Sequence, residues 1–260
     1  MKTNQLLDRR RFLQITTAGL AMSFSPSFSE TRPLSPSRIK AVAFDGFAIF
    51  DPRPIANLAS ALFAGRGTEL VNEWRTRQFE YSWLRTITGN YSDFWQVTGD
   101  ALTYAANKIG LSISPGEAAQ LMEGFLKLEP WPDVVPTLNQ LRGEGLPLAI
   151  ISDLTPRMME ACVANSALQR IFQCLLSTDQ VRAFKPDPRT YGMGTAAFNL
   201  RREENLFVAY AGWDAVGSKR FGYPTYWVNR LHLPAEELGE HADATYADLN
   251  GVGTFIRDRG

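Results

Sequence analysis

Residues 39–45 read Ile-Lys-Ala-Val-Ala-Phe-Asp, a short apolar run that ends in a carboxylate. Such a run is typical of a strand buried on both faces of a parallel sheet. Four similar runs follow, at residues 147–151, 171–176, 206–211 and 225–228. Helical periodicity separates them, at residues 134–141, 156–164, 188–199 and 215–221. The alternation predicts an α/β fold with a doubly wound parallel sheet.

One long interval breaks this alternation. Between about residues 54 and 128 there is helical periodicity and no strand signal. Residues 114–117 read Ser-Pro-Gly-Glu, a capping box with proline at the first helical position. We therefore expect an inserted helical cap at residues 54–129, and an α/β core made of residues 30–53 and 130–260.

The first 29 residues differ from the rest of the chain. A charged start leads to Arg9-Arg10-Arg11-Phe12-Leu13, and a modest apolar stretch and a Ser/Pro-rich segment follow. This order is typical of an export signal, and the arginine run resembles the twin-arginine type. We expect cleavage between residues 27 and 30 and a periplasmic location. The alternative is a disordered or helical N-terminal arm.

Composition excludes several classes of protein. The 260 residues carry 27 basic and 27 acidic side chains, so the basic footprint of a nucleic-acid-binding protein is absent. No apolar run reaches the length of about 18 residues that a membrane span needs. Two cysteines exclude a disulfide scaffold. Cys162 and Cys174 would be able to oxidise in the periplasm, although two free buried thiols are the favoured reading.

The ends of the expected strands indicate where to look for chemistry, since ligands of such sheets bind at the carboxyl ends of strands. The residues found there are Asp45, Ser152 with Asp153, and 211–214, with Lys185 in a later loop. A carboxylate that ends a buried strand, beside free backbone N–H groups, is a candidate nucleophile. From Asp45 alone, a helix cap or a loop carboxylate remains open.

Taken together, these strand ends resemble the haloacid dehalogenase superfamily. The matching stretches, in the superfamily's order, are Val-Ala-Phe-Asp45, Ile-Ile-Ser152-Asp153, Phe-Lys185-Pro-Asp-Pro-Arg-Thr-Tyr191 and Ala-Gly-Trp213-Asp214. Residues 74–85 of the insert, and residues 221–230, resemble the L-2-haloacid dehalogenases of type II. The resemblance covers residues 39 to about 257 and implies a hydrolase acting on a small 2-haloalkanoic acid.

The resemblance implies a role for each matching residue. Asp45 would attack the carbon that bears the halogen, and water would cleave the resulting ester. Lys185 would pair with Asp45, and Asp214 would orient Lys185 and help to activate the water. The expected substrate-binding residues are Ser152, Asp153 and the N–H groups of Gly46 and Phe47. Arg75 would reach the leaving halide from the cap. An apolar pocket would be lined by Phe47, Phe94, Tyr191 and Trp213.

Other readings of these residues stay open. Lys185 would otherwise be a solvated loop lysine and Arg75 a helix-face arginine. Tyr191 and Trp213 are more readily explained as packing residues, and Asp214 would also cap a helix that starts near residue 215.

No metal or cofactor is expected. Phosphatases of the superfamily place a second Asp two residues after the nucleophile, where this chain has Phe47. They also hold Mg²⁺ with acidic residues at the stretch that is Ala209-Tyr210-Ala211 here. A hard cation would therefore lack oxygen ligands, and phosphoryl transfer is disfavoured.

Four positions depart from the pattern that the resemblance implies. Ile49 replaces a threonine, Ala209 a serine, Ala211 an asparagine, and Asp153 the asparagine expected to cradle the leaving halide. A negative charge about 4 Å from a forming anion costs roughly 4 kcal/mol at an effective dielectric constant near 20. Asp153 would then either pair with Arg75 and block halide capture, or serve a leaving group that needs a proton.

Three readings of the function follow. The leading one is hydrolytic dehalogenation of a short 2-haloalkanoic acid through an ester of Asp45. The second is hydrolysis of another small carboxylic acid, and the third is a non-catalytic exported binding protein. We also expect a homodimer, because dimers are common in the family that the chain resembles.

Overall fold

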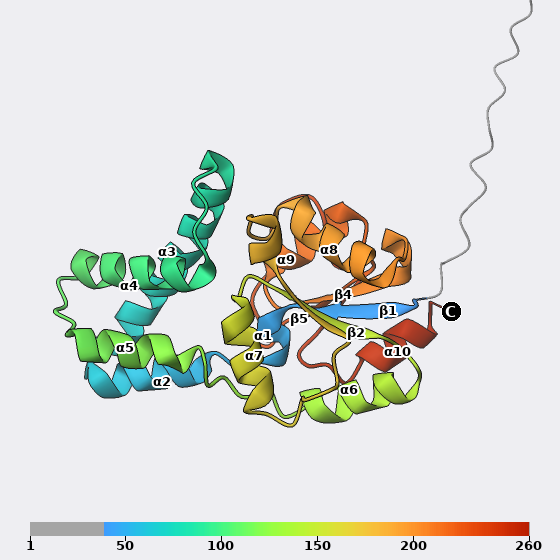
Figure 1. The fold of residues 1–260 in the computed structure, drawn as a ribbon, viewed down its shortest axis with the longest axis horizontal. Coiled ribbons are helices and arrows are strands. Elements are labelled where there is room, and N and C mark those ends of the chain that lie inside the picture. The colour runs from blue at the N-terminus through green and yellow to red at the C-terminus, as the bar shows by residue number, and fades with distance from the viewer. Residues whose placement is uncertain (1–38, 260) are drawn as a thin grey trace, which may run out of the picture. The chain divides into compact units, whose positions relative to one another are not determined.

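The computed structural model describes residues 39–259. In this range the chain forms one parallel sheet of six strands in the order β3-β2-β1-β4-β5-β6. The α/β fold with a parallel sheet is therefore confirmed (Figure 1). The strands are β1 (Ala41–Phe44), β2 (Leu148–Ser152), β3 (Cys174–Ser177), β4 (Asn205–Ala209), β5 (Thr225–Val228) and β6 (Ala244–Tyr246).

The strand order places a crevice at the end of β1. Strand β1 pairs with β2 on one side and β4 on the other, so the chain winds outward in both directions from this point. At the last residue of β1, Phe44 aligns with Ile150 of β2 and Val208 of β4. A ligand site is expected where the strand order reverses, beyond the carboxyl ends of the strands. Asp45 is the first residue past that point.

Helices cover both faces of the sheet (Figure 1). One face carries α6 (Val134–Gly143), α7 (Pro156–Ala164) and α10 (Val252–Arg257), and the other carries α8 (Pro188–Phe198) and α9 (Gly212–Phe221). Alternate strand residues serve the two faces, because successive side chains of a strand point to opposite sides. Val42 and Phe44 belong to the first apolar core, whereas Ala43 belongs to the second.

Four of the helices between β1 and β2 follow one another from residue 53 to residue 124, shown in cyan to green in Figure 1. They are α2 (Arg53–Leu62), α3 (Gly67–Thr88), α4 (Phe94–Lys108) and α5 (Pro115–Gly124), and we call them the cap. The capping box at Ser114 and Glu117 is formed as the sequence predicts. The two chain segments that join the cap to the sheet lie side by side, since Phe50 forms an antiparallel bridge with Pro130.

Several element boundaries differ from the sequence expectation. The third strand begins at Cys174 and not at residue 171, because residues 171–173 complete a turn after α7. Helix α9 begins at Gly212 and not at residue 215, so β4 ends at Ala209. The sheet also has an unpredicted edge strand, β6, which is short and half exposed and therefore lacks an apolar run.

The two cysteines are free thiols, as favoured from the sequence. Among residues 39–259, no helix combines the length and the apolar character needed to cross a membrane. The expected export signal at residues 1–29 lies outside the described residues.

Candidate active site

Asp45 is held at the tip of β1 by the backbone around it. Its N–H donates to the Val208 carbonyl at 2.9 Å, which extends the pairing of β1 with β4 by one residue. Its side chain is also the N-cap of the short helix α1 (Gly46–Ile49), because Oδ1 accepts the Phe47 N–H at 3.1 Å. The helix-cap reading is thus correct, and the same contact fixes the direction of the carboxylate.

Lys185 joins the predicted catalytic residues into one buried cluster. Its Nζ donates to Asp45 Oδ2 at 2.7 Å and to Asp214 Oδ2 at 2.8 Å. The side chain of Lys185 is 2% exposed, so the reading of a solvated loop lysine is wrong. Tyr191 lies behind the cluster, and its hydroxyl donates to the other Asp214 oxygen, Oδ1, at 2.7 Å.

Burial and charge together shift the protonation of this cluster. Burial raises the pKa of Asp214 to about 6, against the attraction of Lys185. Burial alone would lower the pKa of Lys185, but the carboxylates of Asp214, Asp45 and Asp153 outweigh it and hold that pKa above its usual value. The Lys185 ammonium is therefore the positive charge that offsets the negative charges of these buried carboxylates.

Ser152 and Gly46 approach each other at the ends of neighbouring strands. A Cβ atom on Gly46 would lie 2.4 Å from Ser152 Oγ, so only glycine fits there without displacing the serine. Ser152 Oγ accepts the Leu154 N–H at 3.2 Å, and its proton has no acceptor within residues 39–259. The Phe47 N–H, expected to bind substrate, already donates to Asp45. Of the expected substrate donors, the Ser152 hydroxyl thus lines the inner cavity with its proton unused among the described residues.

Asp153 does not pair with Arg75, so that expectation is wrong. Asp153 Oδ1 instead accepts the Thr178 hydroxyl at 3.0 Å and the Lys185 backbone N–H at 3.1 Å. The Arg75 guanidinium carbon lies 5.9 Å from the ring centres of both Phe79 and Tyr210. Burial raises the pKa of the Asp153 carboxyl to about 7, in spite of the opposing attraction of Lys185.

Two cavities meet at this site. The inner one has a volume of about 20 Å³, which is room for about one water molecule. Its walls combine polar and aromatic side chains: Asp45, Phe47, Phe79, Phe94, Ser152, Asp153, Lys185, Tyr210, Ala211, Trp213 and Asp214. An outer cavity of about 230 Å³ shares Phe47, Phe79 and Tyr210 with it and is lined mainly by residues of α2 and α3 of the cap.

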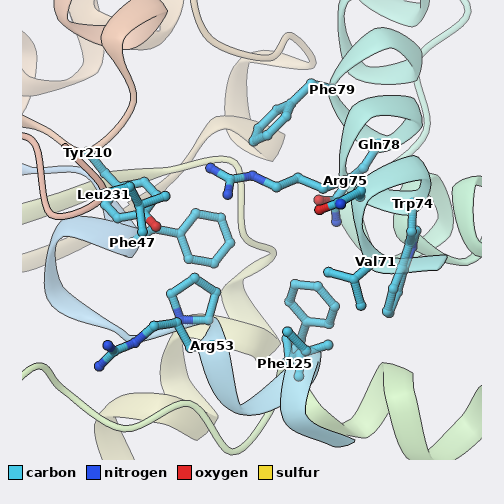
Figure 2. Close-up of a pocket in the computed structure, with 14 residues that line it drawn as sticks. Phe47, Arg53, Val71, Trp74, Arg75, Gln78, Phe79, Phe125, Tyr210 and Leu231 are labelled. Carbon is cyan, nitrogen blue, oxygen red and sulfur yellow. The ribbon is translucent and has the colours of Figure 1, made fainter. Parts of the chain in front are cut away.

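Arg75 borders the outer cavity and not the inner one. Figure 2 shows its side chain extending from α3 across the opening, between Phe79 and Phe47 and toward Tyr210. None of the ion pairs among residues 39–259 includes Arg75. Arg75 therefore places a cation without an ion-pair partner among residues 39–259 on the wall of the outer cavity, next to the cavity that contains Asp45.

Two sequence expectations for single residues need correction. Tyr191 does not line either cavity, because it is fully buried against α9 and supports Asp214 from behind. Asp214 does not cap a helix, since α9 begins at Gly212 with Ala211 as its N-cap. Phe94 and Trp213 do line the inner cavity, as expected.

Sequence reasoning missed four residues that shape the site. Tyr210 and Phe79 are shared walls of the cavities, Thr178 bonds Asp153, and the Trp83 indole donates to the Lys185 carbonyl at 3.1 Å. Phe79 lies one helical turn after Arg75, and Tyr210 lies between the two altered alanines. Helical spacing from Arg75 could therefore have identified Phe79, and the position at a strand end could have identified Tyr210.

The loop that carries Asp45 is supported without the hydroxyl that Ile49 lacks. Ile49 is fully buried among apolar side chains. The Trp131 indole donates to the Phe47 carbonyl at 3.0 Å, and Arg230 Nη2 donates to the Ala48 carbonyl at 3.0 Å. Two side chains thus hold the loop by its backbone oxygens.

Within residues 39–259, no group of three or more His, Cys, Asp or Glu side chains is arranged to hold a metal ion.

Sequence comparisons point to one family. A family model described as a haloacid dehalogenase-like hydrolase matches residues 27–222. Haloacetate dehalogenase H-2 of Moraxella sp. (strain B) is 37% identical over 220 residues, covering 84% of this chain and 98% of that protein. The (S)-2-haloacid dehalogenase of Pseudomonas sp. (strain YL) is 37% identical over 215 residues, covering 82% and 93%.

Comparison with solved structures points to the same family. The L-2-haloacid dehalogenase of Xanthobacter autotrophicus with chloropropionic acid covalently bound has a TM-score of 0.78 and 32% identity. The match covers 84% of this chain and 98% of that chain.

Proposed function

Because the chain belongs to the haloacid dehalogenase-like hydrolase family, we propose that it hydrolyses the carbon–halogen bond of a short 2-haloalkanoic acid. The observation that carries this function is the Asp45 carboxylate. It ends the central strand, lines the inner cavity and lies 2.7 Å from a buried ammonium. An ion-paired carboxylate in a small, largely apolar cavity is suited to attack carbon, because little water competes for it.

The reaction has two steps. In the first, a carboxylate oxygen of Asp45 bonds to C2 of the substrate, and the C2–halogen bond breaks with its electron pair leaving on the halide. In the second, water adds to the Asp45 ester carbonyl, which restores the carboxylate and releases the 2-hydroxy acid and one proton. Asp214, whose pKa burial raises to about 6, is linked to Asp45 through their shared partner Lys185 and helps to take up that proton.

The neighbouring side chains have distinct roles in this proposal. Lys185 keeps Asp45 ionised and aimed, and Tyr191 fixes the Asp214 carboxylate through its hydroxyl. Ser152 and the Gly46 N–H bind the substrate carboxylate. Arg75 attracts the anionic substrate at the entrance and reaches the halide when the cap closes. Phe47, Phe79, Phe94, Tyr210 and Trp213 exclude water from the inner cavity.

A direct test combines a substrate panel with isotope labelling. We expect halide release from monohaloacetates and from one enantiomer of 2-chloropropionate. A single turnover in heavy-oxygen water should place the label in the Asp45 carboxylate and not in the product, because water attacks the ester carbonyl. Mass spectrometry of the peptide that contains Asp45 measures this. Label found in the product after one turnover would exclude an ester of Asp45.

The organisation of the whole chain is also a proposal. We infer a core of residues 30–53 and 130–260, a cap of residues 54–129, and an export signal at residues 1–29 that directs the protein to the periplasm. The Arg9-Arg10-Arg11-Phe12-Leu13 run supports the signal. Recovery of the full chain in the cytoplasmic fraction would contradict it. We also propose a homodimer, because dimers are common in the family that the chain resembles. A monomer mass measured by light scattering would contradict it.

A further inference from the structure

Asp153 occupies the position where the resemblance implies an asparagine, and its hydrogen bonds are those of an amide. Both donors that reach it, Thr178 Oγ1 at 3.0 Å and the Lys185 N–H at 3.1 Å, bond to the same oxygen, Oδ1. An asparagine carbonyl would accept the same two bonds. No donor within residues 39–259 reaches Oδ2, which occupies the place of the amide NH₂ group.

Oδ2 is the atom that Asp153 can offer to the inner cavity. Asp153 lines this cavity together with Asp45 and Trp213, and its residue surface is only 8% exposed. An ionised carboxylate is an acceptor on both oxygens, whereas a protonated one has an O–H donor. The protonation state of Asp153 therefore decides whether the site offers a donor or a negative charge at this point.

The charged surroundings favour the protonated state. Lys185 is the cation facing Asp153, and its ammonium is shared between the carboxylates of Asp45 and Asp214. The Asp214 carboxylate opposes ionisation of Asp153, and burial, the largest cause, raises the Asp153 pKa to about 7. The other titratable groups facing Asp153 are the phenols of Tyr91, from the cap, and Tyr191, from α8, both with raised pKa values.

We propose that Asp153 works as a neutral carboxylic acid whose Oδ2–H donates a hydrogen bond to the halide that leaves C2. This proposal rests on the proposed function and deepens it. The halide departs with the electron pair of the C2–halogen bond and accepts the hydrogen bond, while the proton stays on Asp153. The acid thus does the work of the missing amide, and only while it is protonated.

The pH dependence of Asp153→Asn tests the proposal. The donor is present below the Asp153 pKa and is lost above it, so kcat/KM of the wild-type enzyme should fall as pH rises through about 7. The fall is about tenfold per pH unit, or about 100-fold at pH 9, relative to the plateau. Asp153→Asn should lack this decline, since an amide does not titrate. Equal declines in both proteins would overturn the proposal.

A binding measurement separates this proposal from the proposed function. Bromide binding needs no turnover, and it can be followed by titrating bromide into halide-free buffer and recording tryptophan fluorescence, to which Trp213 of the inner cavity contributes. Wild-type affinity should weaken with rising pH as kcat/KM does, and Asp153→Asn should bind equally well at pH 6 and pH 9. If bromide binding follows this pattern but neither protein releases halide from a 2-haloacid, the proposed function is refuted and the assignment of Asp153 as a hydrogen-bond donor is supported. Equal and pH-independent binding by both proteins would overturn the donor, whether or not halide is released.

Asp258→Asn is the matched control for both measurements. Asp258 is an exposed carboxylate at the end of α10 and lines neither the inner nor the outer cavity. This variant should keep the wild-type pH dependence of bromide binding and of kcat/KM. A flattened profile in Asp258→Asn would show that loss of any carboxylate has this effect, and would overturn the assignment to Asp153.

Discussion

Asp45→Asn is expected to lower kcat for halide release by about four orders of magnitude or more, because it removes the attacking group itself. An amide oxygen is a much weaker nucleophile than a carboxylate. The variant also places an NH₂ group against either the Phe47 N–H or the Lys185 ammonium, both of which are donors. Halide release under saturating substrate, with heavy-oxygen labelling of the wild type alongside, measures the effect.

The fold of this variant should persist. Lys185 keeps its bond to Asp214, and the site loses one of its like charges. Since Asp45 raises the pKa of Asp214, that pKa should fall in the variant. Circular dichroism and thermal unfolding check that the protein is folded, and Asp258→Asn is the substitution with matched chemistry and full activity expected. If folded Asp45→Asn kept more than a tenth of the wild-type kcat, Asp45 would not be the nucleophile.

The core of the site was predictable because it depends on strand ends. Asp45, Ser152 and Asp214 each follow a buried run, and parallel strands bring their carboxyl ends to one edge of the sheet. Lys185 was predicted from the order of the motifs and not from a strand end, because its loop does not directly follow a strand. Its 2.7 Å contact with Asp45 agrees with that expectation.

The parts that were not predictable depend on loop paths and on side-chain competition. The Asp153–Arg75 pair failed because Thr178 and the Lys185 N–H, both from the segment after β3, reach Asp153 Oδ1. No sequence periodicity reports that path. Trp131 and Arg230 support the Asp45 loop from segments 84 and 182 residues away from the carbonyls that they bond. Such contacts become visible only in three dimensions.

The altered positions are less damaging than they look in the sequence. Ile49 removes a hydroxyl, but Trp131 and Arg230 hold the same loop. Asp153 adds a carboxyl, but burial raises its pKa to about 7, which weakens the negative charge it contributes at neutral pH. Ala211 lines the inner cavity beside Tyr210, whose ring is part of the same wall. The site is thus changed in its polar contacts, while aromatic side chains still line the inner cavity.

Lys185→Met should cause the largest loss of stability together with a loss of activity of about a thousandfold or more. Removing one partner of a buried ion pair costs about 3–5 kcal/mol, because the other charges stay buried without compensation. Here Asp45, Asp153 and Asp214 would remain without their shared cation. Chemical denaturation at several pH values measures the stability, and halide release measures the activity.

The pH dependence of that loss identifies its cause. Buried carboxylates without a cation have folded-state pKa values raised above their unfolded values, so folding favours their protonated form. Their stabilising contribution is present below about pH 4 and is lost as pH rises toward the folded-state pKa, which for Asp214 and Asp153 is already about 6 and about 7 in the wild type. Lys185→Met should therefore be much less stable at pH 8 than at pH 5, relative to the wild type.

Two further variants make the result decisive. Lys127→Met removes a lysine that is 69% exposed and whose ion pair within residues 39–259 is with Glu123, and it should change stability by no more than about 0.5 kcal/mol at either pH. Lys185→Arg keeps the charge and should recover much of the stability, but its planar fork cannot reproduce both ammonium contacts, so activity should stay low. If Lys185→Met matched Lys127→Met in stability at pH 8, the buried carboxylates would not need this cation, and its role in keeping Asp45 ionised would fall with it.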